Sequence, residues 1–413
     1  MGNSSSHTAH HFETFAGLPR VQPSEFETSP VKRDRTLKHL LRANHHNYAV
    51  LYNRDRFHNH LPHVLGSAYL LGATSEHLQK LYDVDIETLE PWRDAPQEIV
   101  RDDWRDFLGQ RDYQRAYMDF FEDQLVRHNY DWKSVVNEYL LEGKEPILHG
   151  MIGGLGHPLI HLGYAYELDN RDVAMEALVL GTTNYNFLHK YIDDAFPMKK
   201  YDSGKETASA LSLITELRQD SRLDGLFEHQ GADNIEKLFQ EREDVVLEYF
   251  NRYDGSDIAK AHQELSKVAT LMMIATTESN YDFFICHLLT TSYAIRVLLP
   301  ELPVKFAESL VKAHWLFVLV VYCIQLRPEI KPELIDEVDV EGKTWEKVVK
   351  EALVHKAYDD VEDTHYLKSV RALKDYGALF LEDEEFYRKA AVKFTWGFDR
   401  WGGFGAEEDG ERN

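Results

Sequence analysis

The sequence predicts an all-α protein that folds as one large helical domain. Apolar residues recur at every third or fourth position over most of the chain, beginning with Leu37, Leu40 and Leu41. This is the spacing of the buried face of a helix. Strand signals are rare, because no Asn-Gly turn separates alternating apolar stretches and no strand–helix rhythm indicates a parallel sheet. With 413 residues, 43% of them hydrophobic, the chain can enclose a core and a deep pocket.

Each expected helix rests on this periodicity and on local start or stop signals. The first contains the leucines that precede His45, and the second contains Leu61, Leu65 and Leu71 and ends before Gly72. Pro158 suits the first turn of a later helix, since its missing N–H would be unpaired there anyway. The further helices are expected at residues 113–127, 131–142, 157–168, 171–196, 205–217, 234–252, 257–276, 280–299, 303–326, 344–356, 359–376 and 384–396.

Three regions follow from this pattern. Residues 1–30 are polar and contain three prolines, which predicts an extended N-terminal arm. Residues 31–397 form the helical domain, in which no repeat of a fixed period is found. Residues 398–413 are expected to form an acidic C-terminal tail, or a docking segment that uses the motif Trp401-Gly-Gly-Phe-Gly405.

Composition excludes several classes of function. The net charge of −24 and the lack of a Lys/Arg-rich stripe argue against a nucleic-acid-binding protein. The two cysteines, Cys286 and Cys323, are too few for a disulfide framework and favour a reducing compartment. The N-terminus has no apolar signal region. A cytoplasmic location is therefore expected.

Membrane attachment is not favoured by the sequence. The most apolar run, residues 315–324, is shorter than a transmembrane span and predicts a core helix. The start of the chain, Met1-Gly2-Asn3-Ser4-Ser5-Ser6, matches the N-myristoylation pattern. Without a neighbouring basic patch a single acyl chain binds membranes weakly. A polar, Ser-rich terminus is the preferred interpretation.

The glycine-rich run Gly150-Met-Ile-Gly-Gly-Leu-Gly156 does not indicate a nucleotide site. A dinucleotide fingerprint needs a preceding strand and the spacing G-x-G-x-x-G, and a phosphate-binding loop needs Gly-Lys-Ser/Thr. The run is expected to form a tight turn that directs the helix beginning near His157. No flavin or nicotinamide domain is recognised.

The strongest functional signal is the distribution of the 21 histidines. Several of them fall in four short segments that lie in or beside apolar helical stretches, where an unpaired imidazole would be costly. Histidines that meet on buried helix faces are typical of metal centres. The segments are Arg56-Phe-His-Asn-His-Leu-Pro-His63, the stretch from His149 to His161, Cys286-His-Leu-Leu-Thr-Thr291 and Asp363-Thr-His-Tyr-Leu-Lys368.

The spacing of residues within these segments indicates which histidines can act together. His60 and His63 are three residues apart and His157 and His161 are four apart, so each pair can share a helix face. His287 lies in a helix that is apolar nearly all round. Taken singly, each is more commonly a hydrogen-bonded core histidine. The histidines interpreted as packing residues are His45, His46, His58 and His314.

Lys368 follows His365 by three residues and leaves two interpretations open. A protonated lysine repels a metal cation, so a lysine among ligands must be neutral or modified. Reaction of the neutral amine with carbon dioxide would give a carbamate, which is chemically a carboxylate. Alternatively Lys368 pairs on the surface with a nearby acidic residue, of which the sequence offers Asp360, Glu362 and Asp363. Residue types alone do not decide between them.

The four segments together resemble the questin oxidase-like family of fungal polyketide oxygenases. The resemblance rests on residues 57–63 with Leu70-Leu-Gly-Ala73, on residues 150–164, on His287-Leu-Leu-Thr-Thr291, and on the pattern Asp363-x-His-x-x-Lys with Arg371-Ala-Leu373. These segments span residues 50 to 376. Each is weak alone, but their order and spacing are fairly specific.

The resemblance implies an enzyme that opens a ring of an anthraquinone-type polyketide with dioxygen. It implies five metal ligands: His60, His157, His287, His365 and Lys368, the last as a carbamate. Such a set would hold Fe(II) and leave one position for dioxygen. His63 and His161 belong to the same motifs and are expected to act catalytically, next to the ligands or against the substrate. Three phenols are candidates for orienting substrate hydroxyls near the metal: Tyr52, Tyr164 and Tyr366.

Two alternatives stay open at this point. The histidines would serve as general acids and bases in a metal-free, NADPH-dependent Baeyer–Villiger oxidase acting on the same substrates, although no NADPH-binding motif is seen. Otherwise the chain is a non-catalytic helical scaffold whose histidines only pack. A homo-oligomer is compatible with each of the three.

Overall fold

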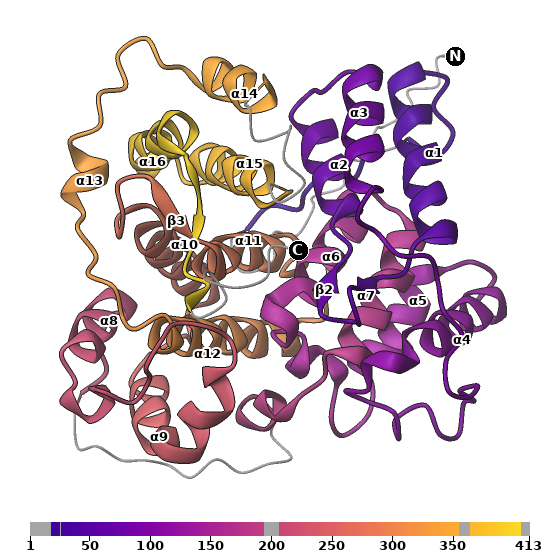
Figure 1. The fold of residues 1–413 in the computed structure, drawn as a ribbon, viewed down its shortest axis with the longest axis horizontal. Coiled ribbons are helices and arrows are strands. Elements are labelled where there is room, and N and C mark those ends of the chain that lie inside the picture. Colours follow the sequence, from indigo (N-terminus) through magenta and orange to yellow (C-terminus); the bar gives the residue numbers. More distant parts are fainter. Residues whose placement is uncertain (1–17, 25, 194–205, 355–363, 406–413) are drawn as a thin grey trace, which may run out of the picture.

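The computed structural model describes residues 18–24, 26–193, 206–354 and 364–405, and helices dominate these residues (Figure 1). The N-terminal helices are α1 (Lys32–Asn47), α2 (Leu61–Leu70), α3 (Ser75–Asp85), α4 (Gln114–Arg127), α5 (Trp132–Val136), α6 (His157–Glu167) and α7 (Arg171–Thr183). The later helices are α8 (Ala210–Arg218), α9 (Asn234–Asn251), α10 (Ile258–Ile274), α11 (Phe283–Leu298), α12 (Ala307–Ile324), α13 (Glu333–Asp336), α14 (Trp345–Val354), α15 (Thr364–Leu379) and α16 (Glu384–Gly397).

Strands are short in the described part of the chain. Strands β1 (Leu51–Tyr52) and β2 (Phe57–His58) form an antiparallel pair, with Leu51 opposite His58. Strands β3 (Asn280–Asp282) and β4 (Arg400–Gly402) pair in parallel, with Tyr281 opposite Trp401. The all-α fold predicted from the sequence is therefore confirmed.

Helices α6 and α11 form the main contact between the two halves of the molecule. In Figure 1 the helices α1–α7 lie on the right and α8–α16 on the left, and α6 and α11 meet between them. Helix α6 also packs on α7 and α2, and α11 packs on α10, α12 and α15. Because α2 packs on α15 as well, the helix starts that carry the histidine segments are held around one point.

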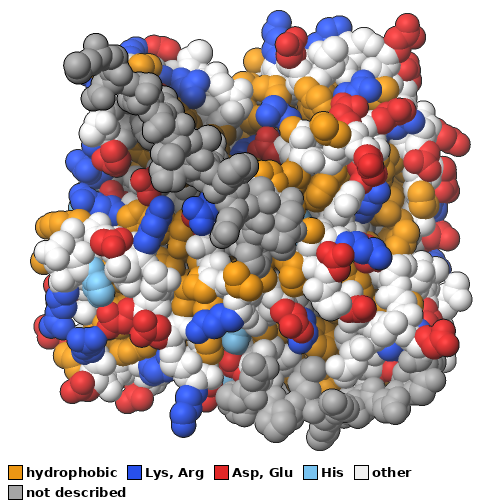
Figure 2. All heavy atoms as spheres, turned by 180° about the vertical axis from the view of Figure 1, so that it is seen from behind, with side chains coloured by type: hydrophobic (Ala, Val, Ile, Leu, Met, Phe, Trp, Pro, Cys, Tyr) orange, Lys and Arg blue, Asp and Glu red, His pale blue; other side chains and the backbone are white. Residues whose placement is uncertain are grey.

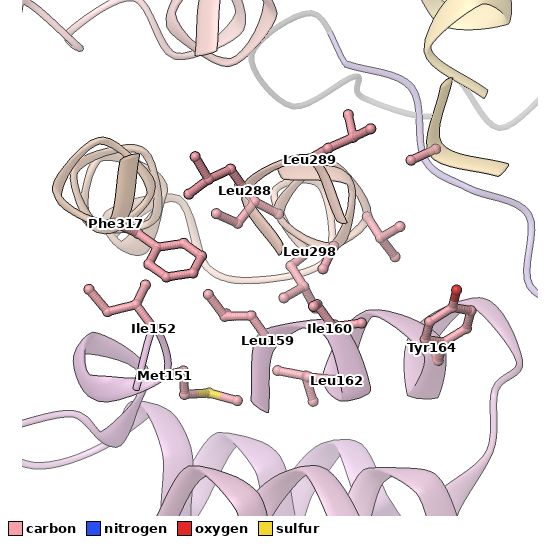
Figure 3. Packing of buried hydrophobic residues seen from close by; sticks show 14 of the residues in the cluster. Met151, Ile152, Leu159, Ile160, Leu162, Tyr164, Leu288, Leu289, Leu298 and Phe317 are labelled. Carbon is pink, nitrogen blue, oxygen red and sulfur yellow. The ribbon is translucent and has the colours of Figure 1, made fainter. Parts of the chain in front are cut away.

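Apolar side chains fill the contact between α6 and α11. Figure 3 shows Leu159 and Ile160 of α6 facing Leu288 and Leu298 of α11, and all four are buried. Gly163 allows the two helices to approach closely, because a Cβ atom there would lie 3.1 Å from the Cα of Ala294. Burial of apolar surface at about 25 cal/mol per Å² makes such a contact a main source of stability.

One expected helix is shorter in the structure, and α3 was not expected. The helix predicted at 171–196 ends at Thr183, where Asn184 bends back to donate its side-chain amide to the carbonyl of Leu180. Residues 187–191 then form a separate 3₁₀ turn. The sequence interpretation also missed α3. Its signals were present, since Thr74 caps the helix by accepting from the N–H of His77 and Leu78 and Leu81 share its buried face.

The terminal segments are more closely packed than the sequence predicted. In the N-terminal arm, Leu18 and Phe26 are buried. The tail predicted to begin at residue 398 starts inside the fold, because Phe398 and Trp401 are buried and β4 completes a strand pair with β3. Residues 1–17 and 406–413, with Gly2 and most of the acidic tail, lie outside the described residues.

The helix at Val304–Ile324 is long and apolar enough to cross a membrane, as judged by length and composition. However, 83% of its most apolar window is buried inside the protein, as in a core helix. On the face seen in Figure 2, Lys and Arg side chains are interspersed with Asp and Glu and form no basic patch. That face gives no support to a nucleic-acid-binding function.

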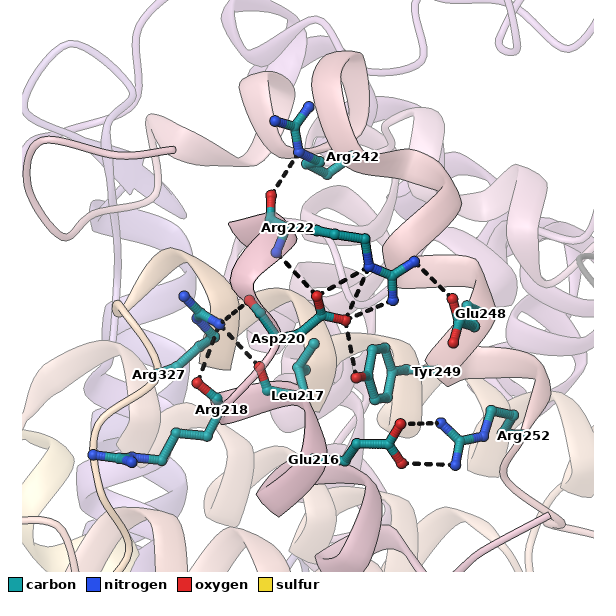
Figure 4. A network of polar contacts seen from close by, with 10 residues as sticks. All are labelled: Glu216, Leu217, Arg218, Asp220, Arg222, Arg242, Glu248, Tyr249, Arg252 and Arg327. Atoms are coloured by element: carbon teal, nitrogen blue, oxygen red, sulfur yellow. Dashed lines mark hydrogen bonds and ion pairs between the residues drawn. The ribbon is translucent and has the colours of Figure 1, made fainter. Parts of the chain in front are cut away.

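A polar network holds α8 to α9 and to the end of α12 (Figure 4). Asp220 is its centre: its carboxylate accepts from the Nε of Arg222 at 3.0 Å and from the hydroxyl of Tyr249 at 3.0 Å. Its backbone carbonyl accepts from Arg327 at 2.8 Å. The hydrogen bonds from Arg222 lower the pKa of Asp220 to about 2.

Replacing Asp220 by asparagine is expected to lower the free energy of unfolding by about 1–2 kcal/mol at pH 7, the scale of a partly exposed charged hydrogen bond. Since the folded-state pKa is depressed, this stabilisation is complete above the unfolded pKa near 3.8 and is lost as the pH falls toward about 2. Urea unfolding of both proteins at pH 7 and pH 3 tests this. An equal difference at the two pH values would contradict it.

Candidate metal centre

The four histidine segments bring one imidazole each to a common point. His60 precedes α2 as its N-cap residue, His157 is the first residue of α6, His287 lies in the second turn of α11, and His365 is the second residue of α15. Three of the four therefore stand at helix starts, where the chain direction is fixed by the packing of α2, α6 and α15. Each of the four rings lies in the protein interior.

Distances between the rings show a tight cluster. The Nε2 atoms of His60 and His157 are 2.7 Å apart. The ring centroids of His60 and His365 are 4.5 Å apart, and those of His287 lie 4.8 Å from both His157 and His365. Ligand atoms of His60, His157 and His365 all lie within 4.8 Å of one another. A single ion can be reached from these three rings, and the ring of His287 lies beside them.

Backbone carbonyls set the tautomers of two of these rings. The Nδ1 of His157 lies 2.7 Å from the carbonyl of Gly154, and that of His287 lies 2.8 Å from the carbonyl of Phe283. A carbonyl only accepts, so each Nδ1 carries the proton and each Nε2 keeps a lone pair. Hydrogen bonding through the outer nitrogen is the usual support of a metal-bound histidine.

Three buried polar atoms in the cluster have no hydrogen-bond partner among the described residues: the Nε2 of His287, the Nε2 of His365 and the Nζ of Lys368. Buried polar atoms without partners are rare and costly. Burial lowers the pKa of both histidines well below the ordinary value, which keeps them neutral. Neutral imidazoles with unused lone pairs fit a divalent cation such as iron.

Lys368 lies inside this cluster and not on the surface. It is 2% exposed, and burial lowers the pKa of its amine to about 7. After burial, its charge is the largest cause that lowers the pKa of His60, His287 and His365. The surface position expected for a salt bridge is therefore wrong for this lysine. Its proposed acidic partners, Asp360, Glu362 and Asp363, lie outside the described residues.

The glycine-rich loop is a structural requirement of the centre. Gly156, at φ +73°, ends the loop directly before His157, and a Cβ atom there would lie 2.2 Å from the hydroxyl of Thr291. A Cβ at Gly154 would meet the side chains of Asn184 and His58. The loop thus lets α6 begin against α11, in agreement with the tight turn expected from the sequence.

Sequence reasoning missed the contribution of His58. Its ring stacks on His157, with 4.0 Å between centroids and 8° between planes, and its Nε2 lies 3.3 Å from the Oδ1 of Asn184. Burial lowers the pKa of His58 to about 3. His58 was predicted only to pack. In the structure it packs directly on a candidate ligand and helps to orient it.

The aromatic cover of the centre was also missed. Phe283 contacts His365 at 4.5 Å and His287 at 5.1 Å between centroids, and Trp401 of β4 lies 6.2 Å from His365. Phe404 packs on Phe283. The segment predicted to be a tail therefore covers the histidines, and its aromatic residues were the sequence signal for this. Such a cover excludes water from one side of the centre.

The structure uses the three candidate phenols differently. Tyr164 stacks on His63, and its hydroxyl lies 2.5 Å from that of Ser67. Tyr366 donates its hydroxyl to the carbonyl of Thr395 on α16, and Tyr52 packs on Phe57. Of the contacts given for these three phenols, only the one made by Tyr164 is to a histidine beside the cluster.

His63 and His161 lie directly beside the cluster. The ring of His63 is 5.4 Å from that of His60, and its Nε2 is 2.8 Å from the Nδ1 of His161. A small cavity of about 10 Å³ adjoins Lys368 on the side of Tyr164 and Tyr293. A larger cavity, of about 570 Å³, lies at α8 and α10 and is lined by none of the candidate residues. Of the two cavities, only the small one adjoins a candidate ligand, Lys368.

Comparison with known proteins places these residues in a wider group. The sequence pattern of the questin oxidase-like family matches residues 57–373, which include all four histidine segments. The Baeyer–Villiger oxidase mdpL of Emericella nidulans is 26% identical over 391 residues, covering 88% of this chain and 86% of the relative. The questin oxidase of Aspergillus terreus is 23% identical over 389 residues, covering 87% and 83%. The Baeyer–Villiger monooxygenase AacuH of Aspergillus aculeatus is 25% identical, covering 81% and 77%.

Proposed function

Since the chain belongs to the questin oxidase-like family, we propose that it is an iron-dependent dioxygenase that cleaves the central ring of a reduced anthraquinone. Its relatives are named questin oxidase and Baeyer–Villiger oxidase, so the chain is an oxidoreductase of the oxygenase type. This excludes the non-catalytic scaffold. The substrate class, the metal and dioxygen as co-substrate are parts of the proposal.

One observation carries the metal. The paired Nε2 atoms of His60 and His157, the unused Nε2 atoms of His287 and His365 and the amine of Lys368 occupy one buried site. Bound there, iron(II) would supply the one-electron reduction of dioxygen. Without the metal, the direct reaction of dioxygen with an aromatic substrate is slow. Lys368 as a carbamate would add the anionic ligand that the histidines lack, because among the described residues the cluster of candidate ligands contains no carboxylate.

The surrounding residues support ring cleavage in other ways. Phe283 and Trp401 shield the histidines from water and present flat faces that suit a fused aromatic substrate. The ring of His63 lies next to that of the proposed ligand His60, and His63 is not itself one of the five proposed ligands. We propose that His63, which is hydrogen-bonded to His161, contacts a hydroxyl group of the substrate.

Labelled dioxygen separates this proposal from the metal-free alternative. The purified protein is expected to contain about one iron per chain, and the ring-opened product is expected to contain two ¹⁸O atoms from ¹⁸O₂ without NADPH consumption. Removal of iron with a chelator should abolish turnover, and added Fe(II) should restore it. One labelled oxygen atom per product, stoichiometric NADPH oxidation and activity that survives chelation would establish the Baeyer–Villiger alternative instead.

A further inference from the structure

A second group of possible metal ligands lies at helices α1 and α4. Both helices pack on α7, and all three lie on the right in Figure 1. His45 and His46 occupy the last turn of α1, and Glu122 belongs to α4. One ligand atom from each of these three residues lies within 4.8 Å of the other two. None of the five ligands proposed for iron belongs to this group.

The spacing of these atoms suits a tetrahedral zinc ion. Ligand atoms that lie about 2.0–2.2 Å from zinc are roughly 3.3–3.6 Å from one another. The Nε2 of His45 is 3.0 Å from the Oε1 of Glu122, and the rings of His45 and His46 meet edge to face with 5.3 Å between centroids. Small adjustments of the side chains would therefore place all three around one ion. Two imidazoles and one carboxylate are a common ligand set of zinc, with water in the fourth position.

Glu176 of α7 supports His45 from the other side of the ring. Its carboxylate is buried and accepts from the Nδ1 of His45 at 3.0 Å, whereas the Nε2 of His45 faces Glu122. A carboxylate bonded to the outer nitrogen is a usual partner of a zinc-bound histidine, because it fixes the orientation of the ring. His45 is itself 4% exposed. Its ring is therefore held in place before any ion binds.

The charges around His45 favour a cation at this point. Burial lowers the pKa of His45, but the hydrogen bonds to Glu122 and Glu176 and the charge of Asp172 prevail and raise it to about 10. Without a metal, a proton therefore neutralises part of the negative charge. A zinc ion would replace the proton on the Nε2 of His45 and be attracted by the same carboxylates. His46 is exposed and Glu122 is 39% exposed, so the ion can enter from solvent.

We propose that His45, His46 and Glu122 form a zinc site that is separate from the iron centre and joins α1 to α4, with Glu176 orienting His45. Both histidines were expected from the sequence only to pack. Zinc is favoured over iron(II) because sites of imidazole and carboxylate generally bind zinc more tightly. The zinc site does not rest on the proposed function, since it shares no ligand with the iron centre.

The experiment adds zinc sulfate to the purified, iron-loaded full-length protein and measures both metals after unbound ions are removed. Wild type is expected to bind one zinc ion per chain while its iron content stays unchanged. Zinc should also raise the urea concentration at the midpoint of unfolding, because it binds an arrangement that exists only in the folded state. X-ray absorption at the zinc edge should show imidazole nitrogens at about 2.0–2.1 Å.

Two variants remove single ligands with little disturbance of the fold. His46 is exposed, which makes His46→Ala a surface substitution, and Glu122→Gln preserves the size of the side chain. Each variant should weaken zinc binding more than about 10–100-fold, the loss typical of a residue that only orients a ligand. Each should also lose the stabilisation by zinc.

Glu138→Gln is the matched control for Glu122→Gln. Glu138 lies 2.7 Å from the Nε2 of His128, so it forms a second pair of a histidine and a glutamate. This pair belongs to no group of three possible ligands among the residues that the structure describes. Glu138→Gln should therefore bind zinc as tightly as wild type does.

Three results would overturn the zinc site. The first is a wild type that binds no zinc beyond its iron, and the second is zinc that binds only by displacing the iron. The third is zinc binding that His46→Ala and Glu122→Gln leave unchanged. That result would place the ion elsewhere, for example at the N-terminal histidines His7, His10 and His11.

Discussion

Replacing His157 by alanine is expected to abolish both iron binding and ring cleavage. The substitution removes the Nε2 that faces His60 at 2.7 Å and whose lone pair is preserved by the hydrogen bond from Nδ1 to Gly154. Loss of a group that merely supports a ligand costs about 10–100-fold in metal affinity or activity. Loss of the ligand itself should exceed this, with kcat reduced more than about 100-fold. Elemental analysis and single-turnover product formation measure the two effects.

His314→Ala serves as the matched control for this prediction. His314 is equally buried, and its Nε2 donates to the carbonyl of Leu288 at 3.0 Å, but it is not part of the cluster. The variant should keep its iron while losing about 1–3 kcal/mol of stability, as expected for a buried hydrogen bond and the space left behind. Iron retained at full stoichiometry in His157→Ala would remove this histidine from the ligand set.

Lys368→Ala is expected to lose activity that a small carboxylic acid restores. Burial lowers the pKa of this amine to about 7, so a substantial fraction is in the neutral form that reacts with carbon dioxide. Its loss removes the anionic ligand and leaves a space in which acetate or propionate can bind the metal. Activity should fall more than about 100-fold, as for the histidine ligand, and recover in part with millimolar acid. Native mass spectrometry of wild type should show the added carbon dioxide.

The control for Lys368 is Lys393→Ala on α16. Lys393 donates to the backbone carbonyl of Glu278 at 3.1 Å, and partial burial lowers its pKa. This variant should retain iron and activity with or without added acid. If Lys368→Ala remains active, or if no carboxylic acid restores it and no carbon dioxide is found on the wild-type chain, Lys368 is not a carbamate ligand.

Much of the fold could be predicted because helical periodicity is strong in this chain. The starts of α6 and α16 were correct to the residue, since Pro158 and the acidic residues at 384 and 385 mark helix beginnings. The region after Thr183 was misread as helix because its composition stays apolar. The side-chain bond of Asn184 that ends α7 has no signature in periodicity.

The site was predicted only in part. Residue spacing identifies side chains that share one face of a helix, but it does not show which helices pack their faces together. The family resemblance implied His60, His157, His287 and His365 as ligands, and the structure places their rings together. The contact of His58 with His157 depends on how β2 approaches the glycine loop. Glu176 and His45, which support His161 through hydrogen bonds, come from α7 and α1 and lie far from every motif.

The most direct measurement is an anomalous X-ray difference map collected on either side of the iron absorption edge from crystals of the purified protein. The account predicts one iron peak within about 2.0–2.3 Å of the Nε2 atoms of His60, His157, His287 and His365, the usual range for metal–imidazole bonds. Density for a carbamate should extend from Lys368 to the same peak. A map with no iron at this point, obtained from protein that cleaves the substrate at full rate, would contradict the account.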